Sequence, residues 1–314
     1  MKKEENKKVH KTSIGGQAVI EGVMMRGPEK IATSVRKSSG EIVLKVDDIG
    51  QVRRKKILKW PIIRGVVNFI DSLVLGVRTL MYSAEQFDVE DEEEAYKPSK
   101  FDDFIERVFN KDTLIYVSVF IALIFSVGLF ILLPAGITSF LRPYVQSDLL
   151  KTLVEGLVRM TIFLVYIFLV SRMKDIQRVF EYHGAEHKTI ACYEHEEELT
   201  VENVKKYSRF HPRCGTSFLI MVMIISVLVF SVISWNNILI RICLKILLLP
   251  VVAGITYEFI KLAGRSDNKI VQILNKPGLW LQRLTTREPD ASQIEVAISS
   301  LNAVCTGNRE DDKW

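Results

Sequence analysis

The chain has 314 residues, of which 48% are hydrophobic and 25% are charged, and its net charge is +5 at pH 7. This small positive excess suits a protein at an anionic membrane surface but is too small to indicate nucleic-acid binding. The four cysteines form no C-x-x-C pair and no regular spacing, which argues against a disulfide framework. We therefore expect free thiols in a reducing compartment.

The N-terminal region predicts a tail followed by a small antiparallel β unit. Residues 1–14 are basic, and because no apolar stretch follows them we expect a disordered tail and no cleavable signal peptide. Residues 15–52 contain short apolar, β-branched runs. The run QAVIEGVMM predicts one strand that ends at Gly27-Pro28, and a turn at 38–40 separates two further strands.

Residues 53–88 have the apolar periodicity of a long amphipathic helix. Arg64, Asp71 and Arg78 recur every seven residues, so they lie roughly along one face with apolar residues around the rest. We expect this helix to lie in the membrane interface, and a fifth, poorer membrane segment is the alternative. Residues 89–112 contain EDEEE and predict an acidic linker and a short helix.

Four later stretches are long and apolar enough to cross a bilayer, which needs about 20 helical residues. The first and third carry no charge, and Pro134 is expected to help end the first. In the second, Glu155 and Arg159 share a helix face and could pair. The predicted spans are 114–133, 153–171, 215–235 and 238–260. The predicted fold is a mainly α membrane protein, a four-helix transmembrane bundle with the small β unit on its cytoplasmic side.

The distribution of Lys and Arg predicts the orientation, because basic connections face the cytoplasm. The connection 172–214 and the tail 259–314 each carry eight basic residues, whereas the connection 134–151 carries two. We therefore expect a multi-pass protein of the cell (plasma) membrane with both termini in the cytoplasm. The lipid bilayer is then its first partner.

Four of the five histidines fall within the predicted cytoplasmic loop 172–214, and the densest segment is EYHGAEHK. On a helix, His183 and His187 project from one face, a spacing that suits two imidazole ligands of one metal ion. Glu186 is a candidate general base, with metal ligand or partner of a ligand as the alternatives. The string H-x-x-E-H is also the inverzincin peptidase signature. Gly184 weakens a helix here, and the alternative is a loop of solvated or hydrogen-bonded histidines.

A metal site needs at least one further ligand. His211 and Cys214 lie just before the third span, where the chain returns to the same membrane face. His195, in the charged EHEEE, and Glu258, at the end of the fourth span, are weaker candidates. Mixed His, Cys and carboxylate ligands favour zinc over magnesium or calcium. The predicted zinc ligands are His183, His187, His211 and Cys214.

The tail after 260 predicts a helix at 291–304, preceded by the polar turn TTREPD, in which a Thr or Asp could cap it. Four arginines are candidates for binding an anionic group, although a structural salt bridge is the alternative for each. They are Arg26, Arg64, Arg213 and Arg287.

Four separated segments resemble, in order, the YqhQ family of bacterial membrane proteins: GGQAVIEGVMMRGP, EYHGAEHK, HPRCGTSF and LWLQRLTTREPDASQIEVAI. The resemblance extends from about residue 15 to about residue 304. The family is a domain of unknown function that is often described as a predicted metal-dependent enzyme. The resemblance therefore implies the membrane architecture and a metal centre, but no substrate.

Two functions stay open on these grounds. The first is a metal-dependent hydrolase at the cytoplasmic membrane surface, in which Glu186 takes a proton from water on zinc and the substrate is a membrane peptide or a lipid-linked group. The second is a non-enzymatic assembly factor, regulator or scaffold that binds other membrane proteins and holds a structural metal or none. Three ligands and an open position favour the first, and four protein ligands favour the second. A transporter is a weaker third hypothesis, because the first and third spans lack midplane polar residues.

Overall fold

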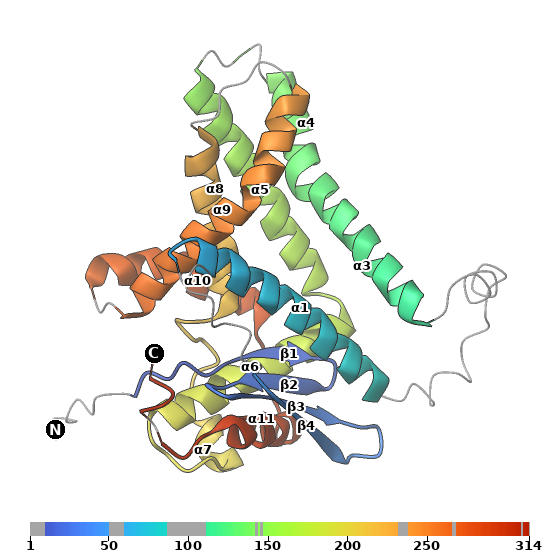
Figure 1. Cartoon of the computed structure of the whole chain (residues 1–314), viewed down its shortest axis with the longest axis vertical. Coiled ribbons are helices and arrows are strands. Elements are labelled where there is room, and N and C mark those ends of the chain that lie inside the picture. Colours follow the sequence, from blue (N-terminus) through green and yellow to red (C-terminus); the bar gives the residue numbers. More distant parts are fainter. Residues whose placement is uncertain are drawn as a thin grey trace. The chain divides into compact units, whose positions relative to one another are not determined.

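The computed structural model describes residues 10–49, 60–86, 111–141, 144, 147–231, 238–265, 268–308 and 310–313 (Figure 1). It divides into two compact units, which we describe separately. Unit 1 comprises Met1–Phe87, Ile167–Val222 and Pro250–Trp314, and unit 2 comprises Asp88–Tyr166 and Met223–Leu249. Most of the predicted basic tail, most of the predicted acidic linker and residues 232–237 lie outside the described residues.

Unit 1 contains a four-stranded antiparallel sheet in the order β1-β2-β3-β4, which confirms the predicted β unit. Its strands are β1 (Gly15–Val19), β2 (Gly22–Arg26), β3 (Lys30–Arg36) and β4 (Ile42–Asp48). The prediction of one strand from QAVIEGVMM is wrong, because the chain reverses between Val19 and Gly22, which pair with each other. The turn residues are Ile20 and Glu21, and Glu21 adopts a positive φ of 48°. The turn therefore lacks the Asn-Gly or Asp-Gly pair that would have marked it in the sequence.

Three helices cover the two faces of this sheet: α1 (Ile63–Gln86), α6 (Lys174–Glu194) and α11 (Ala291–Val304). Val23 and Met25 are fully buried in a core that they share with residues of α6 and α11. The side chains of alternate residues point to the opposite face, where Lys45 lies 4.8 Å from the centre of the Tyr82 ring on α1. Both faces of the central strands are therefore buried.

Helix α11 begins and ends where the sequence predicts. Asp290 caps it by accepting a hydrogen bond from the backbone N–H of Gln293, whose side chain in turn accepts from the backbone of Asp290. Ser300 then ties the helix to the sheet, because its hydroxyl donates to the carbonyl of Val23 at 2.7 Å and accepts from the N–H of Ser34 at 3.0 Å.

The segment predicted as a His-rich loop is mostly helical, with α6 over residues 174–194 and the short α7 (Val201–Lys205) after it. Gly184 does not interrupt α6. A Cβ atom at this position would overlap the carbonyl oxygen of Arg287, in the segment that follows α10 (Lys269–Thr285). The glycine therefore permits a close approach of two backbones, which the hydrogen bond from Arg287 N–H to the carbonyl of Phe180 (2.8 Å) maintains.

The chain is mainly helical, with one small antiparallel sheet among the described residues. Within the described ranges, four helices are long and apolar enough to cross a membrane, judged by length and composition. They are Ile63–Gln86, Val117–Phe140, Leu149–Val170 and Ile242–Leu262, the last within α9 (Ile238–Arg265). The set differs from the predicted one in one member. Helix α1, which was expected to lie in the interface, qualifies, whereas the third predicted span is described only as the shorter apolar helix α8, Gly215–Ser231.

Unit 2 shows that Pro134 does not end the first predicted span. Helix α3 (Lys111–Val127) continues through a π-helical turn, η4 (Gly128–Leu132), into α4 (Leu133–Leu141). Proline has no N–H to offer the carbonyl four residues earlier, that of Phe130. Arg159, on α5 (Asp148–Val170), donates to this carbonyl instead at 2.9 Å, so a partner from another helix allows the chain to pass the proline.

The predicted pairing of Glu155 with Arg159 is present in unit 2, at 3.1 Å, and has a third member. Lys245 of α9 also donates to the Glu155 carboxylate, and Arg159 donates to the Ser226 hydroxyl at 3.1 Å. All four side chains are buried. Charges within apolar helices need partners of this kind, because each ion loses its hydration there.

The close approach at Gly184 predicts a large effect of a single methyl group. Gly184→Ala should destabilise the protein by about 1–3 kcal/mol, because the new Cβ forces the two backbones apart. Thermal unfolding in detergent measures this change. Gly136→Ala is the matched control, since no atom of another element lies within 4 Å of its Cβ position. An unchanged melting temperature for Gly184→Ala contradicts the packing argument.

The buried ion cluster predicts that its carboxylate stabilises unit 2 by neutralising two cations. Glu155→Gln should cost about 3–5 kcal/mol, because it leaves Arg159 and Lys245 without a counter-charge. The double variant Glu155→Gln/Lys245→Met should lose less than the single one, as it removes one of those cations. Denaturant titration in detergent measures both, and equal stability of the single variant and the wild type would disprove the cluster.

Candidate metal centre

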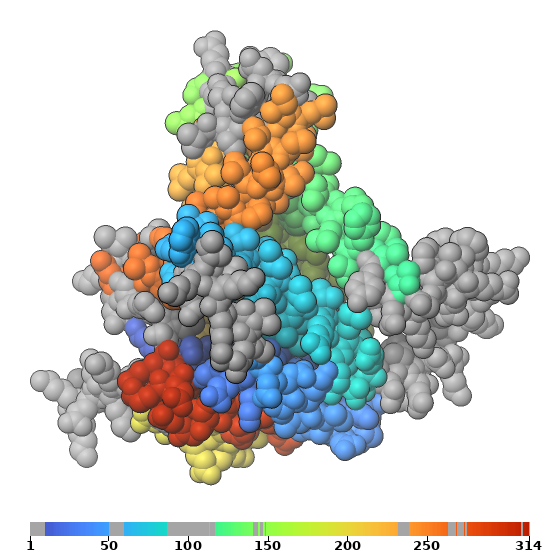
Figure 2. Space-filling view, in the orientation of Figure 1, coloured from blue at the N-terminus to red at the C-terminus, as the bar shows by residue number. Residues whose placement is uncertain are grey.

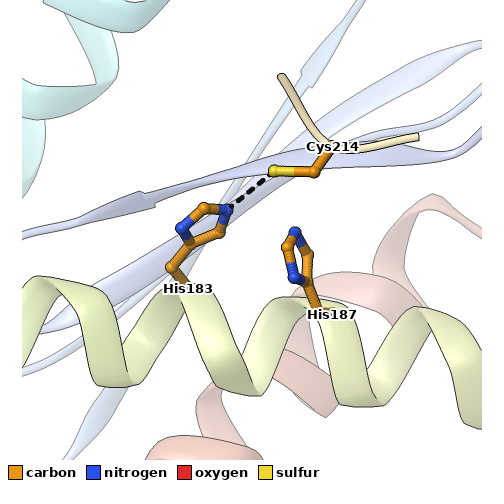
Figure 3. Close-up of side chains that lie close together, drawn as sticks. All are labelled: His183, His187 and Cys214. Atoms are coloured by element: carbon orange, nitrogen blue, oxygen red, sulfur yellow. Dashed lines mark hydrogen bonds between the residues drawn. The ribbon is translucent and has the colours of Figure 1, made fainter. Parts of the chain in front are cut away.

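Three of the four predicted ligands meet in unit 1: His183, His187 and Cys214, whose ligand atoms all lie within 4.8 Å of one another (Figure 3). The two histidines rise from the same face of α6, as their four-residue spacing predicts, with ring centroids 4.4 Å apart. Cys214 immediately precedes α8 and lies over the two rings (Figure 3). The cysteine is 27 residues from His187 in sequence, so only the tertiary fold brings the three together.

Backbone carbonyls fix the orientation of both imidazole rings. His183 Nδ1 lies 2.8 Å from the carbonyl oxygen of Thr285, and His187 Nδ1 lies 2.6 Å from that of Arg209. A carbonyl only accepts, so Nδ1 carries a proton in each ring and Nε2 is the nitrogen left to bind an ion. Nε2 of His183 lies 3.2 Å from the Cys214 sulfur, and Nε2 of His187 is buried without a hydrogen-bond partner. Metal-binding histidines have this arrangement, with the second ring nitrogen held by a carbonyl.

The electrostatics of the group favour a charged sulfur. Burial alone raises the pKa of the Cys214 thiol, but His183 and His187 outweigh it and hold that pKa well below its usual value. Burial lowers the pKa of His183, but the neighbouring Cys214 outweighs burial and raises this pKa to about 9, above its usual value. The site thus stabilises a thiolate beside a positive charge, and the thiolate is the form in which cysteine binds metal.

Glu186, the predicted general base, is buried beside the sheet. The backbone of Gly16 on β1 hydrogen-bonds its carboxyl group, and a Cβ atom at Gly16 would lie 2.9 Å from the Glu186 Cδ atom. The other carboxyl oxygen, Oε2, is buried and has no hydrogen-bond partner. Burial raises the pKa of this carboxyl group. The residue therefore lies next to the histidines in sequence but outside the three-residue ligand group.

His211, the fourth predicted ligand, is not part of the group. Its ring centroid lies 5.6 Å from that of His187, and its Nε2 lies 3.5 Å from a carboxylate oxygen of Glu194. The Gln282 side chain holds its backbone with two hydrogen bonds of 2.8 Å. Burial lowers the pKa of this histidine, which favours a neutral ring.

Glu194 is a central residue that the sequence analysis missed. Its carboxylate accepts hydrogen bonds from Arg213 and from the N–H of Thr12, at 2.8 Å for the latter. Thr12 and Ile14, at the end of the predicted tail, are buried in unit 1. The signal was available, because Glu194 follows His187 by seven residues and lies on the same side of α6.

The other candidates lie elsewhere. His195 is exposed and hydrogen-bonds its own helix at Ala191. Glu258 does not approach the histidines, because Arg64 donates to its carboxylate through two nitrogens. Arg64 and Arg213 thus take part in structural ion pairs, which was the alternative considered for each.

Comparison with known proteins identifies the family. Residues 60–307 match the family model described as "Protein of unknown function (DUF1385)". The chain is also 35% identical over 301 residues to the uncharacterized protein YqhQ of Bacillus subtilis (strain 168), an alignment that covers 92% of this chain and 91% of that protein. No solved structure matches the chain. The chain belongs to the DUF1385 family, and the matched region contains every element from α1 to α11.

Proposed function

We propose that this protein is a zinc-dependent hydrolase that acts at the cytoplasmic surface of the cell membrane. The observation that carries the proposal is the pair of histidines whose Nδ1 atoms are held by carbonyls and whose ligand atoms lie within 4.8 Å of each other and of the Cys214 sulfur. The carbonyl contacts orient the rings before any ion binds, which is how proteins prepare imidazole ligands.

The donor set fits zinc. Two imidazole nitrogens and one thiolate suit this ion, and the buried, unpartnered Nε2 of His187 lacks the partner that a buried polar atom ordinarily has. Among the described residues the group has three members, which leaves one position open, as in catalytic zinc sites. Bound zinc acts as a Lewis acid that polarises water or a substrate oxygen.

Glu186 is the residue we assign to proton transfer. It precedes His187 directly, and its buried Oε2 has no hydrogen-bond partner that would occupy its lone pairs. Gly16 holds the carboxyl group from the sheet side, so the side chain is positioned by two elements. In the proposed role this carboxylate accepts a proton from the attacking water and passes it to the leaving group.

A structural metal in a non-enzymatic assembly factor, regulator or scaffold is the second candidate function. The specific observation in its favour is His211, whose ring lies next to that of His187 and whose neutral form is favoured by burial. A rotation of this ring away from Glu194 would supply a fourth protein ligand and close the site.

The metal proposal predicts about one zinc ion per chain in the detergent-purified protein. His187→Ala should lose this zinc, because it removes the ligand atom that has no other partner. His195→Ala is the matched control, an exposed histidine of the same segment, and should retain it. Mass spectrometry of the metal content measures the zinc bound per chain in the wild type and in both variants. Equal zinc in wild type and His187→Ala, or none in either, removes the site.

His211→Ala separates the two candidate functions. A three-ligand hydrolase site keeps its zinc in this variant, with metal affinity within about tenfold of the wild type. A closed structural site loses it. Zinc binding by competition with a chromogenic chelator measures the difference.

Glu186→Gln tests catalysis apart from metal binding. The variant should bind zinc like the wild type but fail to restore function to cells that lack the gene, because the amide cannot take up a proton. Lys205→Gln, an exposed change on α7, is the control for expression and membrane content. Full complementation by zinc-loaded Glu186→Gln would exclude the proposed base.

A further inference from the structure

A cavity of about 680 Å³ in unit 1 adjoins the three-residue group. Cys214 and the next residue, Gly215, form part of its lining, so the cavity shares one residue with the proposed zinc site. Its volume falls in the range of sites that bind small molecules. The cavity therefore extends to the candidate metal site at Cys214.

The walls of the cavity are mainly apolar and come from helices of membrane type. Phe69 of α1 stacks on Phe218 of α8 with ring centroids 5.8 Å apart, and Leu73 and Ile260 extend the apolar wall along α1 and α9. Helices α1 and α9 both contain segments long and apolar enough to cross a bilayer. Part of α1 is exposed in Figure 2, and Ile70 and Val74 are among its exposed side chains. The cavity is thus bounded by a helix whose outer side suits lipid chains.

The charged groups of the lining all have one sign. Arg213, Lys261 and Lys313 contribute to it, and no carboxylate does so among the residues that line it. Arg213 is paired with Glu194 and Lys313 with Glu310, and Lys261 interacts electrostatically with Glu258. None of these three acids belongs to the lining. The polar part of the cavity is therefore lined by cationic side chains and by no carboxylate, which favours an anionic group over a cationic one.

We infer that this cavity binds a membrane lipid with a phosphate headgroup, and that such a lipid is the class of substrate for the proposed hydrolase. The headgroup lies beside Arg213 and Lys261, and the acyl chains lie along Phe69, Leu73 and Ile260. The assignment of a substrate rests on the proposed function, whereas the lipid site does not. A peptide suits the cavity less well, because apolar walls leave its backbone amides without partners.

Native mass spectrometry of the full-length protein in detergent tests the lipid site, with dioleoyl phosphatidic acid as the probe. The wild type should bind one molecule, and Lys261→Glu should weaken binding by about tenfold or more. Lys205→Glu, the same charge reversal on an exposed lysine of α7, should leave affinity unchanged within about twofold. Leu73→Trp provides a second test, because it fills the cavity without changing charge and should also weaken binding.

Three comparisons decide between ligand classes. Dioleoylglycerol, which has the chains without the phosphate, and inorganic phosphate, which has the charge without the chains, should both bind at least about tenfold more weakly. Equal binding of either probe, equal affinity of wild type and Lys261→Glu, or selective binding of an acidic peptide in place of the lipid overturns the inference.

His187→Ala should keep lipid binding while it loses zinc. A failed zinc test with intact lipid binding thus rejects the proposed function alone, and the reverse result rejects the lipid site alone.

Discussion

The close approach of two backbones at Gly184 is the constraint on which the site depends. Because no side chain separates α6 from the end of α10 and the residues after it, the carbonyl of Thr285 reaches His183. The same segment accepts a hydrogen bond from Arg209 at the carbonyl of Thr286 (2.7 Å), and the Arg209 carbonyl in turn orients His187. The backbone contact at Gly184 therefore orients both imidazole rings: that of His183 directly, and that of His187 through Arg209. This explains why a residue that weakens helices occurs between two candidate ligands.

One buried carboxylate connects several elements in each unit, Glu194 in unit 1 and Glu155 in unit 2. Neither belongs to the three-residue ligand group. Glu194 connects the N-terminal strand region, Arg213 and His211 in unit 1. Glu155 neutralises two cations between the apolar helices of unit 2. Each is buried and fully engaged, as buried charges must be to offset their lost hydration. The unpartnered Oε2 of Glu186 differs from both, and this difference is the physical reason for assigning it a chemical role.

The proposed chemistry and the proposed ligand meet at one residue. Cys214 contributes a sulfur atom to the candidate zinc site and also lines the cavity whose cations favour a phosphate group. A site of this kind lies at the end of apolar helices and still belongs to the compact unit that contains the sheet. Such a position allows an enzyme to act on a group that remains attached to the bilayer by its chains.

The sequence by itself determined what depends on local periodicity and spacing. Two histidines four apart predicted a shared helix face, and the polar turn before 291–304 predicted the helix and a Thr or Asp cap, which the structure shows to be Asp290. Long apolar runs likewise predicted helices of membrane length, because helix length and bilayer thickness are linked without reference to other contacts.

Only the tertiary structure decided which distant groups meet. It selected Cys214 over His211 as the third member of the group, because Glu194 and Gln282 engage His211 and its backbone. It also carried a helix past Pro134, since Arg159 from another helix supplies the donor that proline lacks. Spacing along a chain contains no information on a partner that lies many residues away, and so these outcomes required the folded protein.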